Sequence, residues 1–206
     1  MSITVRDRRR LSPDESRAVA VAAARQLLRD EGVAAVTLKS VAAKIGRTHA
    51  NLLHHFGTVA GLHRALAEDI AVTVSASISE AIGKRRRGEA SERDVVDAMF
   101  DAFRAERVGE LIGWIALTRQ REALEPVIAT IQSIVEDFRA AGDTRPMDRV
   151  TLGLVLMAIG DSLAGDEVAG ASGLPREAVR DDAVGLIKGI VGEVGLRPLP
   201  FGRICR

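Results

Sequence analysis

Residues 37–56, TLKSVAAKIGRTHANLLHHF, constrain the fold of this chain more than any other stretch. The hydroxyl of Thr37 can accept a hydrogen bond from an unpaired N–H group in the first turn of a helix, which predicts that a helix begins there. Gly46 suits the left-handed conformation that ends many helices. Between these two residues, four apolar residues have the i, i+3, i+4, i+7 spacing of one helical face, namely Leu38, Val41, Ala42 and Ile45.

A second short helix is predicted directly after the glycine. Thr48 can cap its first turn. Leu52 and Phe56 lie four residues apart, so both side chains can face a core. The same helix is rich in hydrogen-bonding side chains, namely His49, Asn51, His54 and His55. A helix, a turn containing glycine and a polar second helix form the layout of a helix-turn-helix that reads DNA.

The first 62 or so residues resemble the N-terminal domain of TetR/AcrR-family transcriptional regulators. The family pattern has a long first helix, Glu-Gly, a Thr that opens helix 2, the motif I/V-A-x-x-A/I-G-V-S, and then x-x-x-L-Y-x-H-F-x-x-K-x-x-L. Residues 30–62 read DEGVAAVTLKSVAAKIGRTHANLLHHFGTVAGL. The residues that match in register are Gly32, Thr37, Val41, Ala42, Gly46, Thr48, Leu52, His55, Phe56 and Leu62. The rest of the chain agrees with the family in length and helical character.

Three positions depart from the family pattern. The family's Tyr is Leu53 here, its Lys after the His-Phe pair is Val59, and its Val after the Gly is Arg47. In the family the Tyr and the Lys usually touch DNA phosphates, and phosphate contacts supply much of the affinity for DNA. Arg47 could replace one of these two contacts.

The resemblance implies an all-α protein of about nine helices. Residues 1–61 would form a three-helix helix-turn-helix domain, in which residues 1–11 are a flexible basic arm that could reach into a minor groove or simply be a disordered tail. Residues 62–206 would form a helical effector-binding and dimerisation domain.

Caps, prolines and apolar spacing predict the remaining helix boundaries. The first helix should begin at Ser12 and Pro13, bury Val19, Ala23 and Leu27, and end at Gly32. Residues 83–91, GKRRRGEAS, read as a loop whose basic run Lys84–Arg87 is solvated. Further helices are expected over about 62–82, from Ser91, over about 108–120, from Pro126 to about 141, from about 147, and over 174–195.

The candidate DNA contacts lie in the two short helices. Lys39, His49 and Asn51 are the predicted base readers, because Lys suits guanine acceptors and Asn suits adenine in the major groove. A plain solvated lysine is the alternative for Lys39. Ala50 could meet a thymine methyl group. The candidates for phosphate contact are Thr37, Arg47, Thr48 and His55.

The four histidines, His49, His54, His55 and His63, do not share a helical face well, so we predict no metal site. His54 is a further candidate for DNA contact, with an ordinary partly exposed residue as the alternative. For His63 we expect that ordinary role. No pair of nucleophile and base and no phosphate loop stands out, so we expect neither an enzyme nor a bound cofactor.

The body should hold a largely aliphatic effector pocket if the resemblance extends there. Candidate walls, each of which could instead be simple core, are Met99, Phe100, Phe103, Trp114, Phe138 and Met157. Asp161 follows Gly160 in an apolar helix, where a buried charge is costly unless it is paired. It could bind a polar or cationic group of a ligand, cap a helix, or face solvent.

The last two helices are predicted to pair with their copies in a second subunit, as in the family. The segment VTLGLVLMAIGDSLAG is apolar nearly all round and must be covered on two sides. Glycines inside these helices cost about 1 kcal/mol each, which close helix approach would offset. The expected interface residues are Leu152, Leu156, Ile159, Leu163, Ile187, Ile190, Val191 and Val194.

Charge is spread unevenly along the chain. Residues 1–60 hold ten Lys and Arg against five Asp and Glu, although the net charge of the whole chain is only +1. A basic N-terminal segment suggests a polyanionic partner, with a solvated surface as the alternative. Cys205 is the only cysteine, the N-terminus does not resemble a signal peptide, and no apolar run is long enough to span a membrane, so we expect a cytoplasmic protein associated with the nucleoid.

These observations predict a homodimeric DNA-binding transcriptional regulator. Members of the family usually repress transcription, so a repressor is expected. Its two recognition helices would enter successive major grooves of a near-palindromic operator. A small-molecule effector in the body would tilt the helix over about 62–82 and release the DNA. The alternative is a helical binding or interaction protein of the same fold that has weak or no affinity for an operator.

Overall fold

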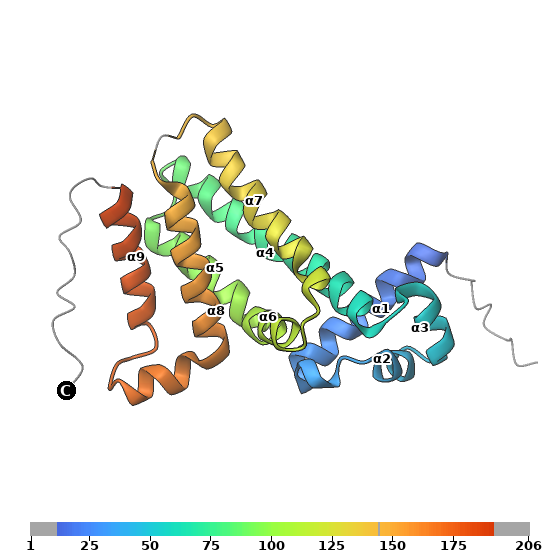
Figure 1. The fold of residues 1–206 in the computed structure, drawn as a ribbon. Coiled ribbons are helices and arrows are strands. Elements are labelled where there is room, and N and C mark those ends of the chain that lie inside the picture. The colour runs from blue at the N-terminus through green and yellow to red at the C-terminus, as the bar shows by residue number, and fades with distance from the viewer. Residues whose placement is uncertain (1–11, 144, 192–206) are drawn as a thin grey trace, which may run out of the picture.

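One long helix, α4 (Val59–Arg86), connects the two ends of the molecule (Figure 1). The computed structural model describes residues 12–143 and 145–191, and over these residues it is all helical with no strand. The expected all-α fold is therefore confirmed. The predicted basic arm, residues 1–11, lies outside the described residues. Three helices form a head at one end, namely α1 (Pro13–Glu31), α2 (Leu38–Lys44) and α3 (His49–Phe56).

Five further helices form the body, in which α5, α6 and α7 pack against α4, α8 packs on those three helices, and α9 packs on α5 and α8. They are α5 (Glu92–Ala105), α6 (Val108–Leu117), α7 (Glu125–Ala140), α8 (Met147–Ala171) and α9 (Ala178–Val191), with two short 3₁₀ turns at Val33–Ala35 and Arg121–Leu124. The helices α8 and α9 lie side by side at the end of the molecule remote from α3 (Figure 1).

Helix α1 begins and ends where the sequence predicts. The hydroxyl of Ser12 accepts a hydrogen bond from the backbone N–H of Glu15 at 3.1 Å, and the Glu15 carboxylate accepts one from the Ser12 N–H at 2.7 Å. Gly32 ends the helix with φ +87°. The buried face differs from the prediction, because Val19 is 43% exposed. The buried residues of α1 are Ala20, Val21, Ala23, Ala24, Leu27 and Leu28, which define a stripe that turns Val19 toward solvent.

Helix α4 is longer than predicted at both ends. Thr58 caps it by accepting a hydrogen bond from the N–H of Gly61 at 3.1 Å, so the helix begins at Val59 instead of near Leu62. It continues through Gly83 to Arg86, where the sequence predicted a loop. An ion pair between Glu80 and Lys84 at 2.7 Å supports this last part, and basic residues are favourable near a helix C-terminus.

The boundaries of the later helices follow the prediction with small shifts. Ser91 and Asp94 form the expected capping box of α5. Pro126 occupies the first turn of α7. Helix α9 begins at Ala178, three residues beyond the predicted Pro175. Helix α8 carries a kink at Ala164, where φ is −148° and ψ is 24°.

Candidate DNA interface and ligand cavity

The helix-turn-helix is built by the caps that the sequence indicates. The hydroxyl of Thr37 accepts from the N–H of Ser40 at 3.0 Å, and that of Thr48 accepts from the N–H of Asn51 at 3.2 Å. Between the two helices, Gly46 adopts φ +65°, a conformation that residues with a side chain rarely take. These local interactions fix the angle between α2 and α3.

One face of α3 is held firmly against the head. Leu52 is completely buried and Phe56 is 8% exposed. From α1, a guanidinium N–H of Arg17 donates a hydrogen bond to the carbonyl of His55 at 3.0 Å, and the same guanidinium lies 4.8 Å from the centre of the Phe56 ring. Because this face is anchored, the opposite face of α3 is presented as a rigid surface.

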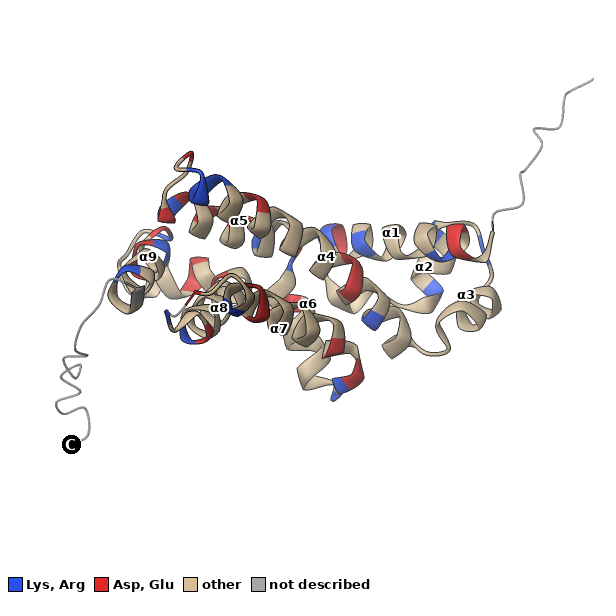
Figure 2. Ribbon diagram, turned by 90° about the horizontal axis from the view of Figure 1, so that it is seen from above, with Lys and Arg blue, Asp and Glu red and all other residues tan. Residues whose placement is uncertain are grey.

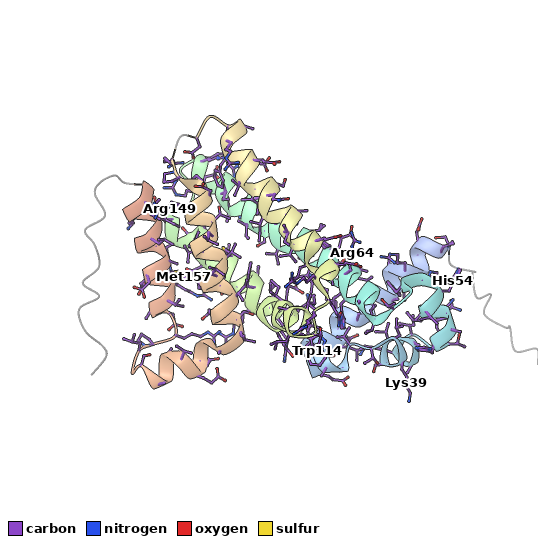
Figure 3. All side chains as sticks on the ribbon, in the orientation of Figure 1. Lys39, His54, Arg64, Trp114, Arg149 and Met157 are labelled. Carbon is purple, nitrogen blue, oxygen red and sulfur yellow. The ribbon has the colours of Figure 1, made fainter. Side chains whose placement is uncertain are left out.

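That opposite face carries most of the predicted DNA contacts. The exposed candidates are Lys39, Arg47, Thr48, His49, Ala50 and His54, whereas Thr37, Asn51 and His55 are half-buried. Lys39 and His54 point away from the body at the same end of the molecule (Figure 3). Helix α3 contains no Lys, Arg, Asp or Glu, as its uniform tan colour in Figure 2 shows, and so offers only neutral hydrogen-bonding groups. The basic residues Lys39 and Arg47 precede it in the chain, on α2 and in the turn.

Two of the three departures from the family pattern place an apolar side chain on α3 or at the start of α4. Leu53 is 44% exposed on α3, and Val59 is 38% exposed at the start of α4. Neither side chain can donate a hydrogen bond. Phosphate contact at these two positions is therefore limited to backbone groups, and the charged side chain nearest in sequence to α3 is Arg47.

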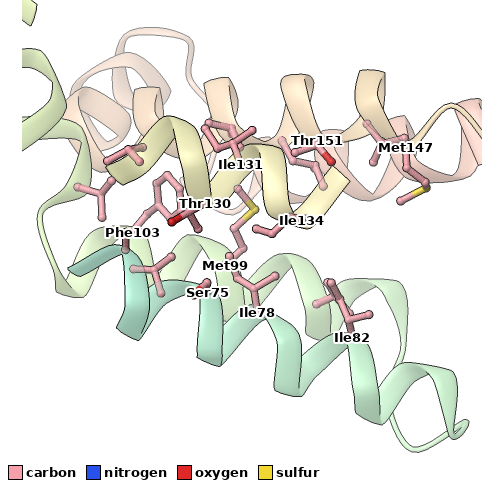
Figure 4. Close-up of a pocket in the computed structure, with 18 of the residues that line it drawn as sticks. Ser75, Ile78, Ile82, Met99, Phe103, Thr130, Ile131, Ile134, Met147 and Thr151 are labelled. Atoms are coloured by element: carbon pink, nitrogen blue, oxygen red, sulfur yellow. The ribbon is translucent and has the colours of Figure 1, made fainter. Parts of the chain in front are cut away.

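The body encloses a cavity of about 190 Å³ between α4, α5, α6, α7 and α8 (Figure 4). A single buried water needs roughly 10–15 Å³ of such a cavity, so the space could hold on the order of ten waters. Its walls are almost entirely apolar, with Ser75, Thr130 and Thr151 as the neutral polar exceptions. Representative wall residues are Ile70, Val74, Ile78, Ile82, Met99, Phe103, Leu111, Ile131, Ile134, Phe138 and Leu154.

Three of the seven predicted ligand residues line this cavity, namely Met99, Phe103 and Phe138. Phe100 is fully buried in the core outside the cavity, with the guanidinium of Arg180 5.6 Å from its ring centre. Trp114 and Met157 are partly buried against the core and do not line the cavity. The sequence analysis did not identify the wall residues of α4, although the fourfold spacing of Ile70, Val74, Ile78 and Ile82 was an available signal.

Asp161 is placed away from the cavity, in the kinked part of α8. It is 5% exposed, and Arg176 donates to its carboxylate at 3.3 Å and to its backbone carbonyl at 2.7 Å. That carbonyl lies three residues before the kink at Ala164. The buried charge is thus paired within the chain, one of the structural roles that a buried Asp can take.

The basic run lies at the end of helix α4 instead of in the predicted loop, although Lys84, Arg86 and Arg87 are exposed to solvent as predicted. Arg85 and Arg86 are helical and line one end of the cavity, as does Arg145. Arg85 forms an ion pair with Glu92, and its hydrogen bond lowers the pKa of that carboxyl. Outside the cavity, a hydrogen bond from Arg145 holds the pKa of Asp143 at about 2.

The head is fastened to the body by polar contacts at both ends of α6. Before α6, the buried carboxylate of Glu106 accepts hydrogen bonds from Arg25 at 2.7 Å and from Arg29. Within α6, Glu110 accepts from the backbone N–H of Val33 at 2.8 Å. Since Val108, Leu111 and Ile112 of the same segment line the cavity, α6 touches both the cavity and the head.

The prediction for His63 is wrong. The side chain is 2% exposed, where the sequence led us to expect an ordinary partly exposed residue. Its Nε2–H donates to the carbonyl of Val36 in the head at 3.0 Å, and its Nδ1 hydrogen-bonds the side-chain amide of Gln120 at 2.8 Å. His63 thus ties the head to the segment that follows α6.

The predicted dimer residues divide into an exposed and a half-buried group. On α8, Leu152, Leu156 and Leu163 are 61%, 60% and 56% exposed. Ile159, Ile187 and Ile190 are half-buried, and Ile187 also lines the cavity. Val191 ends α9, but its side chain lies outside the described part of the structure, as does the whole of Val194. The leucines leave an apolar face of α8 uncovered within one chain.

Two further observations concern chemistry elsewhere in the chain. Within residues 12–143 and 145–191, no three His, Cys, Asp or Glu side chains gather as they would around a metal ion. Among the helices that the structure describes, none is both long enough and apolar enough to cross a membrane.

Comparisons with known proteins agree with this architecture. A sequence model described as bacterial regulatory proteins, tetR family, matches residues 20–66, which cover most of α1, all of α2 and α3, and the start of α4. No curated protein matches the chain.

Several solved structures resemble the whole fold. A Rhodococcus sp. protein assigned to the TetR family of transcriptional regulators is 17% identical with a TM-score of 0.62, over 86% of this chain and 98% of that one. A protein of unknown function from Rhodococcus sp. RHA1 is 23% identical with a TM-score of 0.55, over 88% and 96%. The TetR-family repressor FadR of Thermus thermophilus, solved with lauroyl-CoA, is 16% identical with a TM-score of 0.50, over 90% and 100%.

At these identities the solved structures show the fold, and the match over residues 20–66 identifies the N-terminal domain. The caps of α2 and α3, the left-handed Gly46 between them and the helical body fit that assignment. Residues 20–66 therefore form an N-terminal domain of the tetR family of bacterial regulatory proteins, and the chain as a whole has the fold of the solved TetR-family structures.

Proposed function

We propose that this protein is a homodimeric repressor that binds a near-palindromic operator and leaves it when a small apolar effector enters the cavity of the body. The observation that carries the proposal is the combination of a rigid, exposed α3 at one end with an apolar cavity at the other, joined by α6. This combination suits a protein in which ligand binding at one end changes DNA binding at the other.

The DNA-binding half of the proposal rests on the exposed polar face of α3 and its neighbours. His49 and Asn51 lie near the N-terminal end of α3, which is the part of a recognition helix that contacts base edges. Lys39 and Arg47 add positive charge beside it. In the proposed dimer two copies of this surface would enter successive major grooves, about 34 Å apart.

The regulatory half rests on the position of α6. An effector in the cavity would contact Val108, Leu111 and Ile112. A shift of α6 would move Glu110, which binds the backbone N–H of Val33 in the head. It would also move Gln120, which hydrogen-bonds His63, and His63 in turn binds the carbonyl of Val36 in the head. The effector can favour release only to the extent that it binds the DNA-free arrangement more tightly than the DNA-bound one.

A second candidate is a ligand-binding protein of the same fold that does not bind an operator. Leu53 and Val59 favour it, because they put exposed apolar side chains at two positions where the family pattern has phosphate contacts. The two candidates differ in the strength and salt dependence of DNA binding.

Selection of bound sequences from a random DNA pool with the full chain tests the proposed function. We expect an enriched inverted repeat whose half-sites are separated by about one helical turn. Failure to enrich any sequence, together with the same weak affinity for all DNA at low salt, would favour the second candidate.

Two substitutions should separate base reading from phosphate contact. Asn51→Ala is expected to relax sequence preference at one base pair per half-site by about 1–3 kcal/mol. Arg47→Ala is expected to weaken all sequences alike and to reduce the slope of log affinity against log salt by about 1 per half-site. Binding curves on operator and scrambled DNA at several salt concentrations measure both effects.

Arg121→Ala is the matched control for the loss of charge, because Arg121 is exposed in the 3₁₀ turn before α7, in the body. It should leave both the affinity and the slope unchanged. Equal losses from Asn51→Ala and Arg47→Ala on operator and scrambled DNA would contradict the division of roles.

A further inference from the structure

We propose that the effector is a linear amphiphile, an unbranched alkyl chain with an anionic headgroup, whose headgroup pairs with Arg86 and whose tail reaches α6. The inference rests on the proposed function, because it names the chemical class of ligand that the effector cavity would take. It follows from the distribution of charge along the cavity, from the lack of an ion-pair partner for Arg86 among the described residues, and from the length of the cavity.

Charged side chains line only one end of the cavity. Arg85, Arg86, Glu92 and Arg145 are the charged residues that line it, and the first three lie at the end of α4 or the start of α5. The opposite end is formed by Phe103, Val108 and other apolar residues, next to α6. A ligand that matches this pattern has one polar end and a long apolar remainder.

Arg86 is the cation that remains available at the charged end. Arg85 is paired with Glu92, and Arg145 is paired with Asp143. Among the described residues, no carboxylate lies within ion-pair distance of Arg86, whose guanidinium instead lies 5.8 Å from the centre of the ring of Phe138, a wall residue of the cavity. With three arginines against two carboxylates, this end carries a net positive charge that a carboxylate or phosphate would neutralise.

The shape of the cavity favours an unbranched chain. On α4 its lining extends from Ala67 to Arg86, which corresponds to roughly 28 Å of helix at 1.5 Å per residue. A lining of that length, with its charged residues confined to one end, matches an extended chain that carries a single polar end. The neutral hydroxyls of Ser75, Thr130 and Thr151 lie along the walls and do not supply a second charged site.

Binding to the full-length protein, measured by isothermal titration calorimetry without DNA and below the micellar concentration, tests the ligand class. The probes share one alkyl chain and differ in headgroup: dodecanoate, dodecanol and dodecyltrimethylammonium. We expect dodecanoate to bind roughly tenfold more tightly than dodecanol, and the cation to bind most weakly. In a series from hexanoate upward, each further buried methylene should tighten binding roughly threefold to fourfold until the tail reaches α6.

Arg86→Ala should weaken dodecanoate roughly tenfold and leave dodecanol unchanged, whereas Arg86→Glu should shift the preference toward the cation. Arg87→Ala is the matched control: Arg87 is the next residue, is exposed, pairs with Glu89 at 2.8 Å and does not line the cavity. It should change neither affinity. Comparing the affinities for dodecanoate and lauroyl-CoA distinguishes a ligand with a free carboxylate from one whose chain is carried on a phosphate-bearing group. Arg86→Ala should lower the affinity for whichever of the two binds.

The proposal is overturned if none of the probes binds, if dodecanol or the cation binds as tightly as dodecanoate, or if Arg86→Ala and Arg87→Ala behave alike. Operator release is measured separately. If an alkanoate long enough to reach α6 binds through Arg86 but leaves the operator complex intact, the ligand class stands and the proposed coupling to DNA fails. If no operator exists, the calorimetric result still decides the ligand class.

Discussion

Replacing Leu156 with arginine is expected to convert the proposed dimer into monomers and to weaken operator binding at least about a hundredfold, since two linked half-sites bind with an avidity that one cannot supply. Leu152, Leu156 and Leu163 expose more than half of their side-chain surface along one face of α8. Exposed apolar side chains at such spacing are typical of a helix seam that a partner covers.

The glycines of α8 and α9 fit the same interface. Beyond its own turn of helix, a Cβ atom added at Gly160, Gly185 or Gly189 would meet no atom of the described residues within 4 Å. Nothing in the described part of one chain therefore requires a glycine at these positions, whereas each costs about 1 kcal/mol relative to alanine inside a helix. Close approach of a second copy of α8 and α9 would provide the reason.

Light scattering coupled to size-exclusion chromatography measures the mass, and fluorescence anisotropy with a labelled operator measures the affinity. Val72→Arg is the matched control, because Val72 is 64% exposed on α4, away from α8 and α9. We expect it to leave both the mass and the affinity unchanged. A Leu156→Arg protein that still has the mass of a dimer, or a Val72→Arg protein that dissociates, would show that the interface lies elsewhere.

The parts of the structure that could be predicted from the sequence are those determined by neighbouring residues. Ser12, Thr37, Thr48 and Ser91 each hydrogen-bond a backbone group three residues away, so the amino-acid order alone indicates where those helices begin. The positive φ of Gly46 is equally local. The head therefore matches the prediction closely.

The misplaced residues depend on partners far away in the chain. His63 was expected to be partly exposed, but it is buried between Val36, 27 residues before it, and Gln120, 57 residues after it. The partner of Asp161 is Arg176, on the other side of the kink in α8. Sequence spacing contains no signal for such pairs.

The cavity was predicted only in part for the same reason. Its aliphatic character follows from a composition with 3% aromatic residues, but its position depends on how five helices pack. The composition around Gly83 and Gly88 predicts a loop at the arginines, although the fourfold spacing of Ile78, Ile82 and Arg86 continues the stripe of α4. Periodicity was the better guide there than composition.

Replacing Glu106 with alanine is expected to loosen the head from the body and to uncouple ligand from DNA. The carboxylate is almost completely buried and accepts hydrogen bonds from Arg25 and Arg29 of α1. Its loss leaves Arg25, which is 18% exposed, with only the more exposed Asp69 as a partner. Breaking such a pair costs roughly 3–5 kcal/mol, which in a chain of this size lowers the melting temperature by roughly 6–20 °C.

The same group should make stability depend on pH. Burial raises the pKa of Glu106, but hydrogen bonds from Arg25 and Arg29 outweigh that effect and leave the pKa below its ordinary value. A carboxyl whose pKa is lower in the folded state stabilises the protein fully above its ordinary pKa of about 4.3, and this contribution is lost as the pH falls through the folded value. The stability difference between the natural protein and Glu106→Ala should therefore shrink below about pH 4.

Thermal unfolding between acidic and neutral pH measures the stability, and operator titrations with and without a cavity ligand measure the coupling. For Glu106→Ala we expect operator binding to respond less to ligand. Without the hydrogen bond from Arg25 to Glu106, a movement of the segment before α6 would no longer be transmitted to α1. Glu68→Ala is the matched control, since Glu68 is exposed on α4 and makes no ion pair among the described residues. Equal melting temperatures for the two variants, or full ligand response without Glu106, would show that the head is held by Glu110 and His63 alone.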